Sequence, residues 1–154
     1  FNPIVAEEAF QNNFSVVNDV SGGQDQRMIT TLRKHSVGLI LTHRNKNSSS
    51  LHDKVDYKDI VRDVKNDLMK QVKNILESGV NRDQIAIDVG LGFGKTQEQS
   101  ATLFESIGQF VGDYPLVVGY SRKKFTKLLK TSDEELLNHC QNQGVSLVRL
   151  HFID

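Results

Sequence analysis

The 154-residue sequence lacks several features that would define a class of function at once. It has no tryptophan and a single cysteine, Cys140, so neither an internal disulfide nor a thiolate metal cluster can form. Its 19 basic and 19 acidic side chains cancel, and no positive excess supports binding to nucleic acid. No apolar run approaches the ~18 residues of a membrane-spanning helix. A signal peptide is also absent, which favours the cytoplasm. The missing initiator Met suggests processing or a piece of a longer protein.

Short apolar runs alternate with longer helical patterns along the chain. In the longest pattern, apolar side chains recur every three or four residues, with Asp56 as the expected N-cap and Gly79 as the expected stop. A polar stretch at about 43–55 predicts a loop, which we expect to be mobile. Strands are predicted at 14–17, 37–42, 85–89, 116–119 and 146–149, and helices at 1–10, 24–34, 57–78, 97–110, after Tyr120 and at 132–143.

The order of these elements predicts an α/β fold in one domain, 1–154. The strand segments are continuous apolar runs without polar alternation, so we expect strands buried on both faces of a parallel sheet between helices. Five strands fit an open doubly wound sheet or part of a (β/α)8 barrel. A complete barrel needs at least ~200 residues, so this chain could form only part of one.

Polar side chains follow every predicted strand. Sites in parallel α/β folds form where the carboxyl ends of the strands meet, so we predict one site at that rim. The residues placed there are Asn18, Asp19, Thr42, His43, Asp88, Ser121, Arg122, Lys123, Arg149 and His151.

Three groups of residue types at this rim carry chemistry. The Asp88 carboxylate can accept two hydrogen bonds from an amino-substituted heterocycle, although an Asp there could also brace a loop. Asn18 offers a donor and an acceptor to the same kind of ligand, or it forms a turn. Together, Lys123, Arg149 and His151 predict an anion site beside a helix N-terminus after Ser121, whereas each alone could be a surface charge. Histidine spacing gives no support for a metal site.

The glycine-rich turn after the third strand does not complete a nucleotide-binding motif. Gly94-Lys95-Thr96 resembles the end of a P-loop, but Val89 stands where that pattern needs glycine. The dinucleotide pattern fails as well, because its glycine spacing does not match the short step from Gly92 to Gly94. What remains is a tight turn that brings backbone close to a ligand, or a strained turn with no ligand.

Four segments, in the right order, resemble the dihydropteroate synthases, the pterin-binding transferases of folate synthesis. The segment 18–23 is similar to that family's N-D-V-S-G-G, and 87–96 to its D-P-G-I-G-F-G-K-T. The segment 118–123 is similar to G-x-S-R-K, and 149–151 to R-V-H. The resemblance implies a (β/α)8 TIM-barrel family fold in which strands four to eight are present and the first three βα units are absent.

The resemblance also implies a reaction and its site. An activated 6-hydroxymethyl-7,8-dihydropterin diphosphate condenses with para-aminobenzoate, and diphosphate leaves with the help of Mg²⁺, whose protein ligand would lie outside this segment. The implied pterin-binding residues are Asn18, Asp88, Phe93, Gly119 and Lys123. Arg149 and His151, with Asn18, would bind the diphosphate, and Ser121 and Arg122 would lie on the aminobenzoate side. Lys123, Arg149 and His151 would act in catalysis.

The resemblance also implies that this transferase is a target of sulfonamides. Two alternatives to the transferase stay open. One is a related enzyme that moves a methyl group from methyltetrahydrofolate to a corrinoid; the cationic set formed by Lys123, Arg149 and His151 favours the diphosphate chemistry instead. The other is a truncated, non-catalytic homologue with a scaffold or weak pterin-binding role. We also expect an exposed sheet edge at Val16 and Val17, which favours a homodimer or aggregation.

Overall fold

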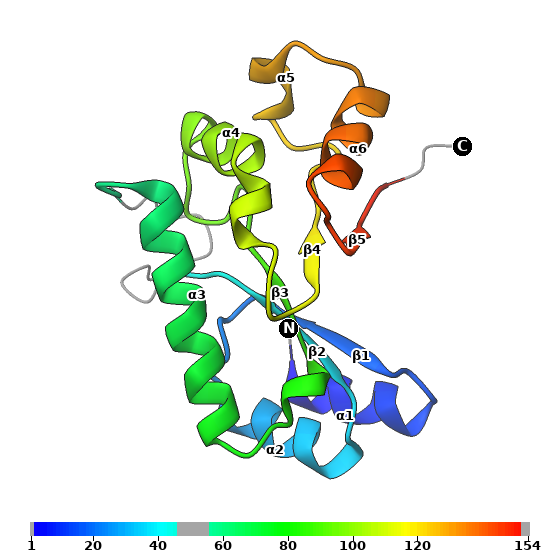
Figure 1. Ribbon diagram of the computed structural model, residues 1–154. Coiled ribbons are helices and arrows are strands. Elements are labelled where there is room, and N and C mark those ends of the chain that lie inside the picture. The colour runs from blue at the N-terminus through cyan, green and yellow to red at the C-terminus, as the bar shows by residue number, and fades with distance from the viewer. Residues whose placement is uncertain (1, 46–55, 152–154) are drawn as a thin grey trace.

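Five parallel strands form one sheet in chain order within residues 2–45 and 56–151, which the computed structural model describes (Figure 1). They are β1 (Val16–Asp19), β2 (Gly38–Thr42), β3 (Ile85–Asp88), β4 (Leu116–Val118) and β5 (Leu147–Val148). A doubly wound sheet reverses its strand order at a switch point, whereas a barrel adds each strand beside the one before. The order β1-β2-β3-β4-β5 is therefore that of a partial barrel, as the sequence pattern and the resemblance together predicted.

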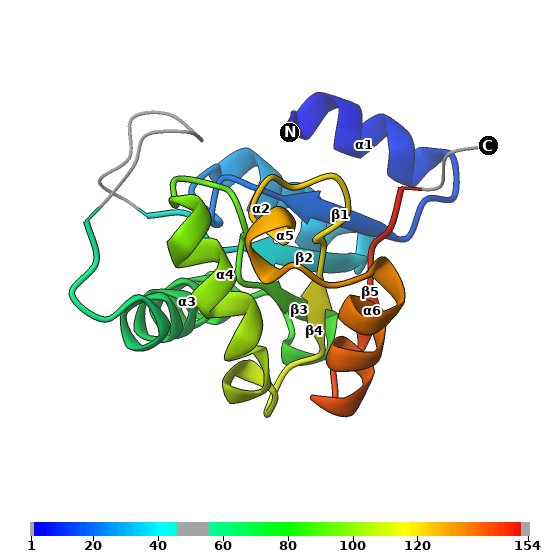
Figure 2. The ribbon, with the colours of Figure 1, turned by 90° about the horizontal axis from the view of Figure 1, so that it is seen from above.

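The helices lie along one side of this sheet. Seen from above, the strands follow one another along a curve, with α3, α4 and α6 outside it (Figure 2). The helices are α1 (Pro3–Gln11), α2 (Gln26–His35), α3 (Ile60–Glu77), α4 (Gln97–Glu105), α5 (Thr126–Leu129) and α6 (Asp133–Asn142), with 3₁₀ turns η1 (Arg82–Gln84) and η2 (Ile107–Phe110).

The main core lies between the sheet and these helices. Every second strand residue points into this core, and the apolar stripe predicted for α3 packs against these residues. Burial of each such side chain contributes about 1.5–3 kcal/mol, which makes this layer the chief source of stability. The strand residues buried here are Leu39, Leu41, Ile85, Ile87, Leu116 and Val118, and those of α3 are Val64, Leu68, Val72 and Ile75.

The opposite face of the sheet is exposed at its two outer strands, although Thr42, Asp88 and Val117 of the central strands are buried on it. The expectation that helices bury both faces is therefore wrong for the described part of the chain. Val16 in β1 and Leu147 in β5 are each 53% exposed, and Phe14, just before β1, is 65% exposed. Apolar runs are typical of strands that are buried on both faces. In a closed barrel, side chains from the other strands fill the interior and bury the inner face. The predicted exposed edge at β1 is present.

Several element boundaries differ from the sequence prediction. Helix α3 begins at Ile60, because Asp59 and not Asp56 caps it, accepting a hydrogen bond from Arg62 N at 3.1 Å. Gly79 does follow its end, with a φ of +87°. The single helix expected at 97–110 breaks at Ser106. The 3₁₀ turn after it brings residues three apart onto one side, so Ile107 and Phe110 are both buried.

Two further expectations concern single residues and the polar loop. Cys140 is fully buried in α6, as predicted for a core thiol. His43, at the start of the loop expected at about 43–55, is also fully buried. Residues 46–55 of that loop lie outside the described residues. Within 2–45 and 56–151, no helix is long and apolar enough to cross a membrane.

Candidate functional site

The predicted site residues that end the strands lie mainly on the open face of the sheet. Thr42 pairs with Asp88 across β2 and β3, and Asp88 pairs with Val117 of β4. Partners in neighbouring strands share a face, and so do residues two apart in one strand. Asn18 pairs with Ile40, two residues before Thr42, so it joins them. The register thus gathers the rim residues of three strands on the side that helices leave uncovered.

Asp88 is the buried anionic centre of this rim. Its side chain is almost inaccessible, and Oδ1 accepts the backbone N–H of Gly90 at 2.8 Å. Nη2 of Arg149 donates to Oδ2 at 3.3 Å. Burial raises the pKa of Asp88, although the Gly90 hydrogen bond and the charges of Lys123, Arg149 and Lys95 oppose that rise. Two fixed donors leave further carboxylate lone pairs available to a ligand.

Gly119 lets the Arg149 guanidinium reach Asp88. A Cβ at Gly119 would lie 2.9 Å from Arg149 Nη2 and 3.2 Å from its Nε, so any side chain there would displace the guanidinium. The backbone N–H of Arg149 donates to Val118 O at 2.8 Å, which continues the pairing of β4 with β5. Arg149 was predicted at the site from its place after a strand and Gly119 from the resemblance; the structure joins Arg149 to Asp88 and packs it on Gly119.

Lys123 and Phe93 form the next part of the rim. Lys123 Nζ donates to the carbonyl of Leu91 and lies 4.9 Å from the centre of the Phe93 ring. Burial lowers the pKa of Lys123; the nearby Asp88 carboxylate raises it, and the Arg149 charge lowers it. A desolvated ammonium over an aromatic face is a strong electrostatic contact. Lys123 thus lies between the Asp88 centre and the turn that carries Phe93.

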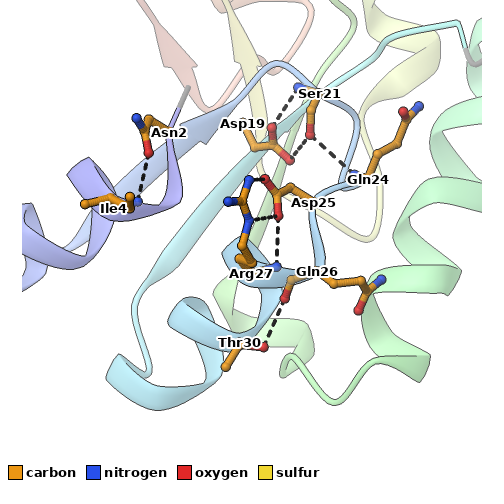
Figure 3. Close-up of polar contacts among 9 residues, drawn as sticks. All are labelled: Asn2, Ile4, Asp19, Ser21, Gln24, Asp25, Gln26, Arg27 and Thr30. Carbon is orange, nitrogen blue, oxygen red and sulfur yellow. Dashed lines mark hydrogen bonds and ion pairs between the residues drawn. The ribbon is translucent and has the colours of Figure 1, made fainter.

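The two polar residues that end β1 point to different sides. Asn18 is exposed on the open face, where its Oδ1 accepts the Thr42 hydroxyl at 3.0 Å. Asp19 is buried and binds its own loop, accepting Ser21 N at 2.7 Å, Ser21 Oγ at 3.0 Å and Gly23 N at 2.9 Å. Figure 3 shows the Ser21 contacts beside Asp25, which caps α2 at Arg27 N. Of this pair, only Asn18 is placed to meet a ligand.

The remaining predicted residues lie at the outer margin of the rim. The backbone N–H of His151 donates to Ser121 Oγ at 3.3 Å, which brings the ends of β4 and β5 together. His151 itself is exposed. Arg122 is exposed too, and its φ of +61° places it in the left-handed region. All three residues are thus less enclosed than Asp88.

Sequence reasoning missed a buried polar cluster under the glycine turn. Lys95 Nζ contacts His43 Nδ1 at 3.0 Å and donates to Gly90 O at 2.9 Å and Phe93 O at 3.0 Å. Burial lowers the pKa of Lys95 to about 7. Burial first, and then the Lys95 charge, lower the pKa of His43 to about 4. Asp67 of α3 lies 3.9 Å from His43 Nε2. Lys95 had been noted only within the failed P-loop pattern and the segment 87–96, with no partner named for it.

A cavity of about 450 Å³ adjoins Lys123 and Phe93. Its walls combine apolar side chains with cations and the first turn of α4; they include Leu91, Phe93, Phe125, Lys123, Lys124 and Thr96. Thr96 caps α4, accepting a hydrogen bond from Gln99 N at 3.1 Å. The cavity can accept a small ring that carries a negative group.

Metal binding finds little support among the described residues. No group of three or more His, Cys, Asp or Glu side chains could hold an ion there. Asp19 is committed to its loop, and Asp88 is bound by Gly90 and Arg149. Residues 2–45 and 56–151 therefore do not build a magnesium site by themselves.

A barrel-type parallel sheet with a buried carboxylate and cations at its rim defines a class of ligand-binding α/β proteins. Within that class, the family model described as "Pterin binding enzyme" matches residues 1–151. The chain belongs to the pterin-binding enzyme family.

Individual relatives support the same membership. The chain is 32% identical to dihydropteroate synthase from Bacillus subtilis (strain 168), over 96% of this chain and 53% of that protein. It is 34% identical to the enzyme of that name from Mycobacterium leprae, over 84% of this chain and 47% of that protein. The chain spans about half the length of the curated relatives it matches.

Solved structures agree with the fold. Dihydropteroate synthase from Thermus thermophilus superposes with a TM-score of 0.83 at 31% identity, covering 97% of this chain and 62% of that one. The enzyme from Clostridium difficile, solved in the presence of pteroic acid, gives 0.81 at 27% identity, covering 98% and 59%. The partial-barrel fold is thereby confirmed.

Proposed function

We propose that this chain is part of a dihydropteroate synthase, a transferase that joins a dihydropterin to para-aminobenzoate. The observation that carries the proposal is the buried Asp88 carboxylate, which faces the open side of the sheet with the Arg149 guanidinium seated over Gly119. The family membership of the chain supports the same assignment.

Pterin recognition follows from the lone pairs of Asp88. A pterin presents an amino group and an adjacent ring N–H on one edge, and a carboxylate accepts two such parallel hydrogen bonds. These donors would offset the burial that raises the pKa of Asp88, and keep it ionised. Asn18 is the rim amide on the same face, and Phe93 offers an aromatic wall beside Lys123.

The cationic end of the rim suits the diphosphate. In the reaction, the amine nitrogen of aminobenzoate forms a bond to the pterin methylene carbon as the C–O bond to diphosphate breaks. The diphosphate leaves with the bonding electron pair, and the attacking nitrogen loses a proton. Lys123, Arg149 and His151 would stabilise the charge that develops on the leaving oxygen, which is catalysis by fixed electrostatics and positioning.

Aminobenzoate would occupy the cavity beside Phe93 and Lys123. Its ring suits the apolar walls, and its carboxylate suits the two lysines Lys123 and Lys124 and the first turn of α4. We expect a sulfonamide to compete there. The resemblance implied Ser121 and Arg122 on this side; neither lines the cavity, and we keep them as proposed neighbours of the aminobenzoate.

Three properties of the whole protein are proposed with the activity. Mg²⁺ would accompany the diphosphate, and no step is assigned to it because the described residues do not build its site. We also propose a cytoplasmic location and a homodimer. Sedimentation velocity tests the dimer, which the exposed apolar edge at Phe14 and Val16 favours; a monomer at all concentrations would contradict it.

A pterin-binding module without turnover is the second candidate, because the chain spans about half the length of its curated relatives. One experiment separates the two: dihydropterin diphosphate, Mg²⁺ and aminobenzoate are incubated with the chain, and dihydropteroate is measured by chromatography while pterin binding is measured in parallel. Product formation that is lost in Lys123→Met supports the synthase. Binding without product supports the module. If the folded chain neither binds nor turns over, the proposal is wrong.

A further inference from the structure

The turn from Gly90 to Gly94 is held from two sides by lysines. On the open face, Lys123 donates to Leu91 O and lies over the Phe93 ring. On the buried side, Lys95 contacts Gly90 O and Phe93 O. An ammonium has three N–H donors, and its third partner here is His43 Nδ1 after β2. Every donor of Lys95 is therefore used inside the protein, and none is left for a ligand.

The two segments that Lys95 joins are closely packed. Gly90 has a φ of +68°, and a Cβ there would lie 2.4 Å from the carbonyl oxygen of His43. The backbone N–H of His43 donates to Asp88 O at 2.7 Å, so the end of β2 adjoins the start of the turn. The Lys95 side chain joins the same two segments, because its Nζ contacts His43 on one side and the glycine turn on the other. The carbonyl of Phe93 is one of its three acceptors, so the ammonium also fixes the residue that carries the aromatic wall.

We propose that Lys95 is the positioning residue of this rim, tying the end of β2 to the glycine turn and thereby fixing Phe93 where it meets the pterin. Lys95 also lines the cavity beside Lys123, but its ammonium is committed to these three acceptors, so we assign it no hydrogen bond to the ligand. Its effect on pterin affinity rests on the proposed function, whereas its effect on the turn does not.

The charge state of Lys95 gives the proposal a second signature. Its pKa lies at about 7, because burial lowers it, the Asp88 charge raises it and the Lys123 charge lowers it. The other titratable groups facing it are His43, in direct contact, and Asp67 of α3 behind His43. A neutral amine keeps two N–H donors, and its hydrogen bonds to Gly90 O and Phe93 O lose the charge assistance that makes an ammonium the stronger donor. The turn should therefore loosen as the pH rises through about 7.

The test uses amide hydrogen exchange of the whole chain without ligand, followed by NMR. The reporter is the Phe93 N–H, which donates to Gly90 O at 3.0 Å. Lys95→Met keeps the length of the side chain and removes its donors. Lys127→Met, at an exposed position of α5, is the matched control. We expect Phe93 protection to fall about tenfold or more in Lys95→Met and to stay unchanged in Lys127→Met.

The pH dependence needs no variant and covers the case in which Lys95→Met fails to fold. In the unmodified chain, Phe93 protection corrected for intrinsic exchange should fall between pH 6 and pH 8.5. Lys127→Met should show the same fall. Protection of Phe93 that is independent of pH, or equal in Lys95→Met and Lys127→Met, would overturn the proposal.

Pterin titration then tests the link to function. We expect the pterin Kd of Lys95→Met at pH 6 to rise at least tenfold above that of Lys127→Met. Equal Kd values, with Phe93 protection lost, would refute the positioning role. If neither the unmodified chain nor Lys127→Met binds pterin, the proposed function fails, and the exchange data still decide whether Lys95 fixes the turn.

Discussion

Acidification should destabilise this fold through His43. The imidazole is fully buried in the cluster with Lys95, and burial with the Lys95 charge holds its pKa at about 4, whereas 6.5 is its ordinary value. Between these two values the unfolded chain binds a proton that the folded chain does not. The free energy of unfolding contributed by this group is therefore complete above about pH 6.5 and is lost as the pH falls to about 4.

The size of the loss follows from the same two values. Each pH unit corresponds to about 1.4 kcal/mol, so the interval from 6.5 to about 4 corresponds to roughly 3–4 kcal/mol. That is a large share of the roughly 5–15 kcal/mol typical of a domain. Urea unfolding followed by circular dichroism at pH 7, 6, 5 and 4 measures it.

His43→Asn is the comparison variant, because an amide oxygen can replace Nδ1 as the acceptor of Lys95 Nζ and cannot become charged. Its stability at pH 7 will differ, so the quantity to compare is the change with pH. Carboxylates such as Glu7, whose pKa is lowered to about 2 by Lys34 and His35, contribute equally to both proteins and cancel. Parallel pH profiles for the two proteins would refute the reasoning.

Three further perturbations have defined outcomes. Gly90→Ala should lower the free energy of unfolding by more than ~1 kcal/mol, because the φ of Gly90 is +68° and a Cβ would meet His43 O. Gly112→Ala, where a Cβ would have nothing within 4 Å, should not lower it. Equal effects of the two substitutions would contradict this prediction. Thr96→Ala should cost about 1 kcal/mol by removing the α4 cap, and Thr96→Ser should restore it in urea unfolding. The Cys140 thiol, whose pKa burial raises to about 11, should resist a thiol reagent at pH 8 until urea is added; rapid reaction of the folded chain would exclude a buried Cys140.

Sequence reasoning predicted the strands and the rim because both depend on local signals. Apolar runs marked the strands, and the residue following each run fell at a strand end by simple counting. Asp88 and Arg149 were therefore named before their contact could be seen, whereas Gly119 was named only through the family resemblance. The open face was missed because an apolar run has the same composition whether its second face meets helices, other strands or solvent.

The buried cluster shows why the rest could not be predicted. Lys95 is 52 residues from His43, and no spacing rule connects a lysine inside a glycine turn to a histidine after another strand. Lysine is rarely buried, so composition argued for the surface. Asp19 and Asn18 show the opposite difficulty: adjacent polar residues at one strand end point to opposite faces, and the register with β2 decides which of them meets a ligand.

The most direct test of the pterin site is a calorimetric titration of the chain with 6-hydroxymethylpterin. Asp88→Asn keeps an oxygen for the Gly90 N–H and removes the carboxylate, and Asp113→Asn, at a surface ion pair with Arg82, is its control. We expect binding by the unmodified chain and by Asp113→Asn, with affinity at least tenfold weaker in Asp88→Asn. Equal affinity in all three proteins would contradict a pterin site centred on Asp88.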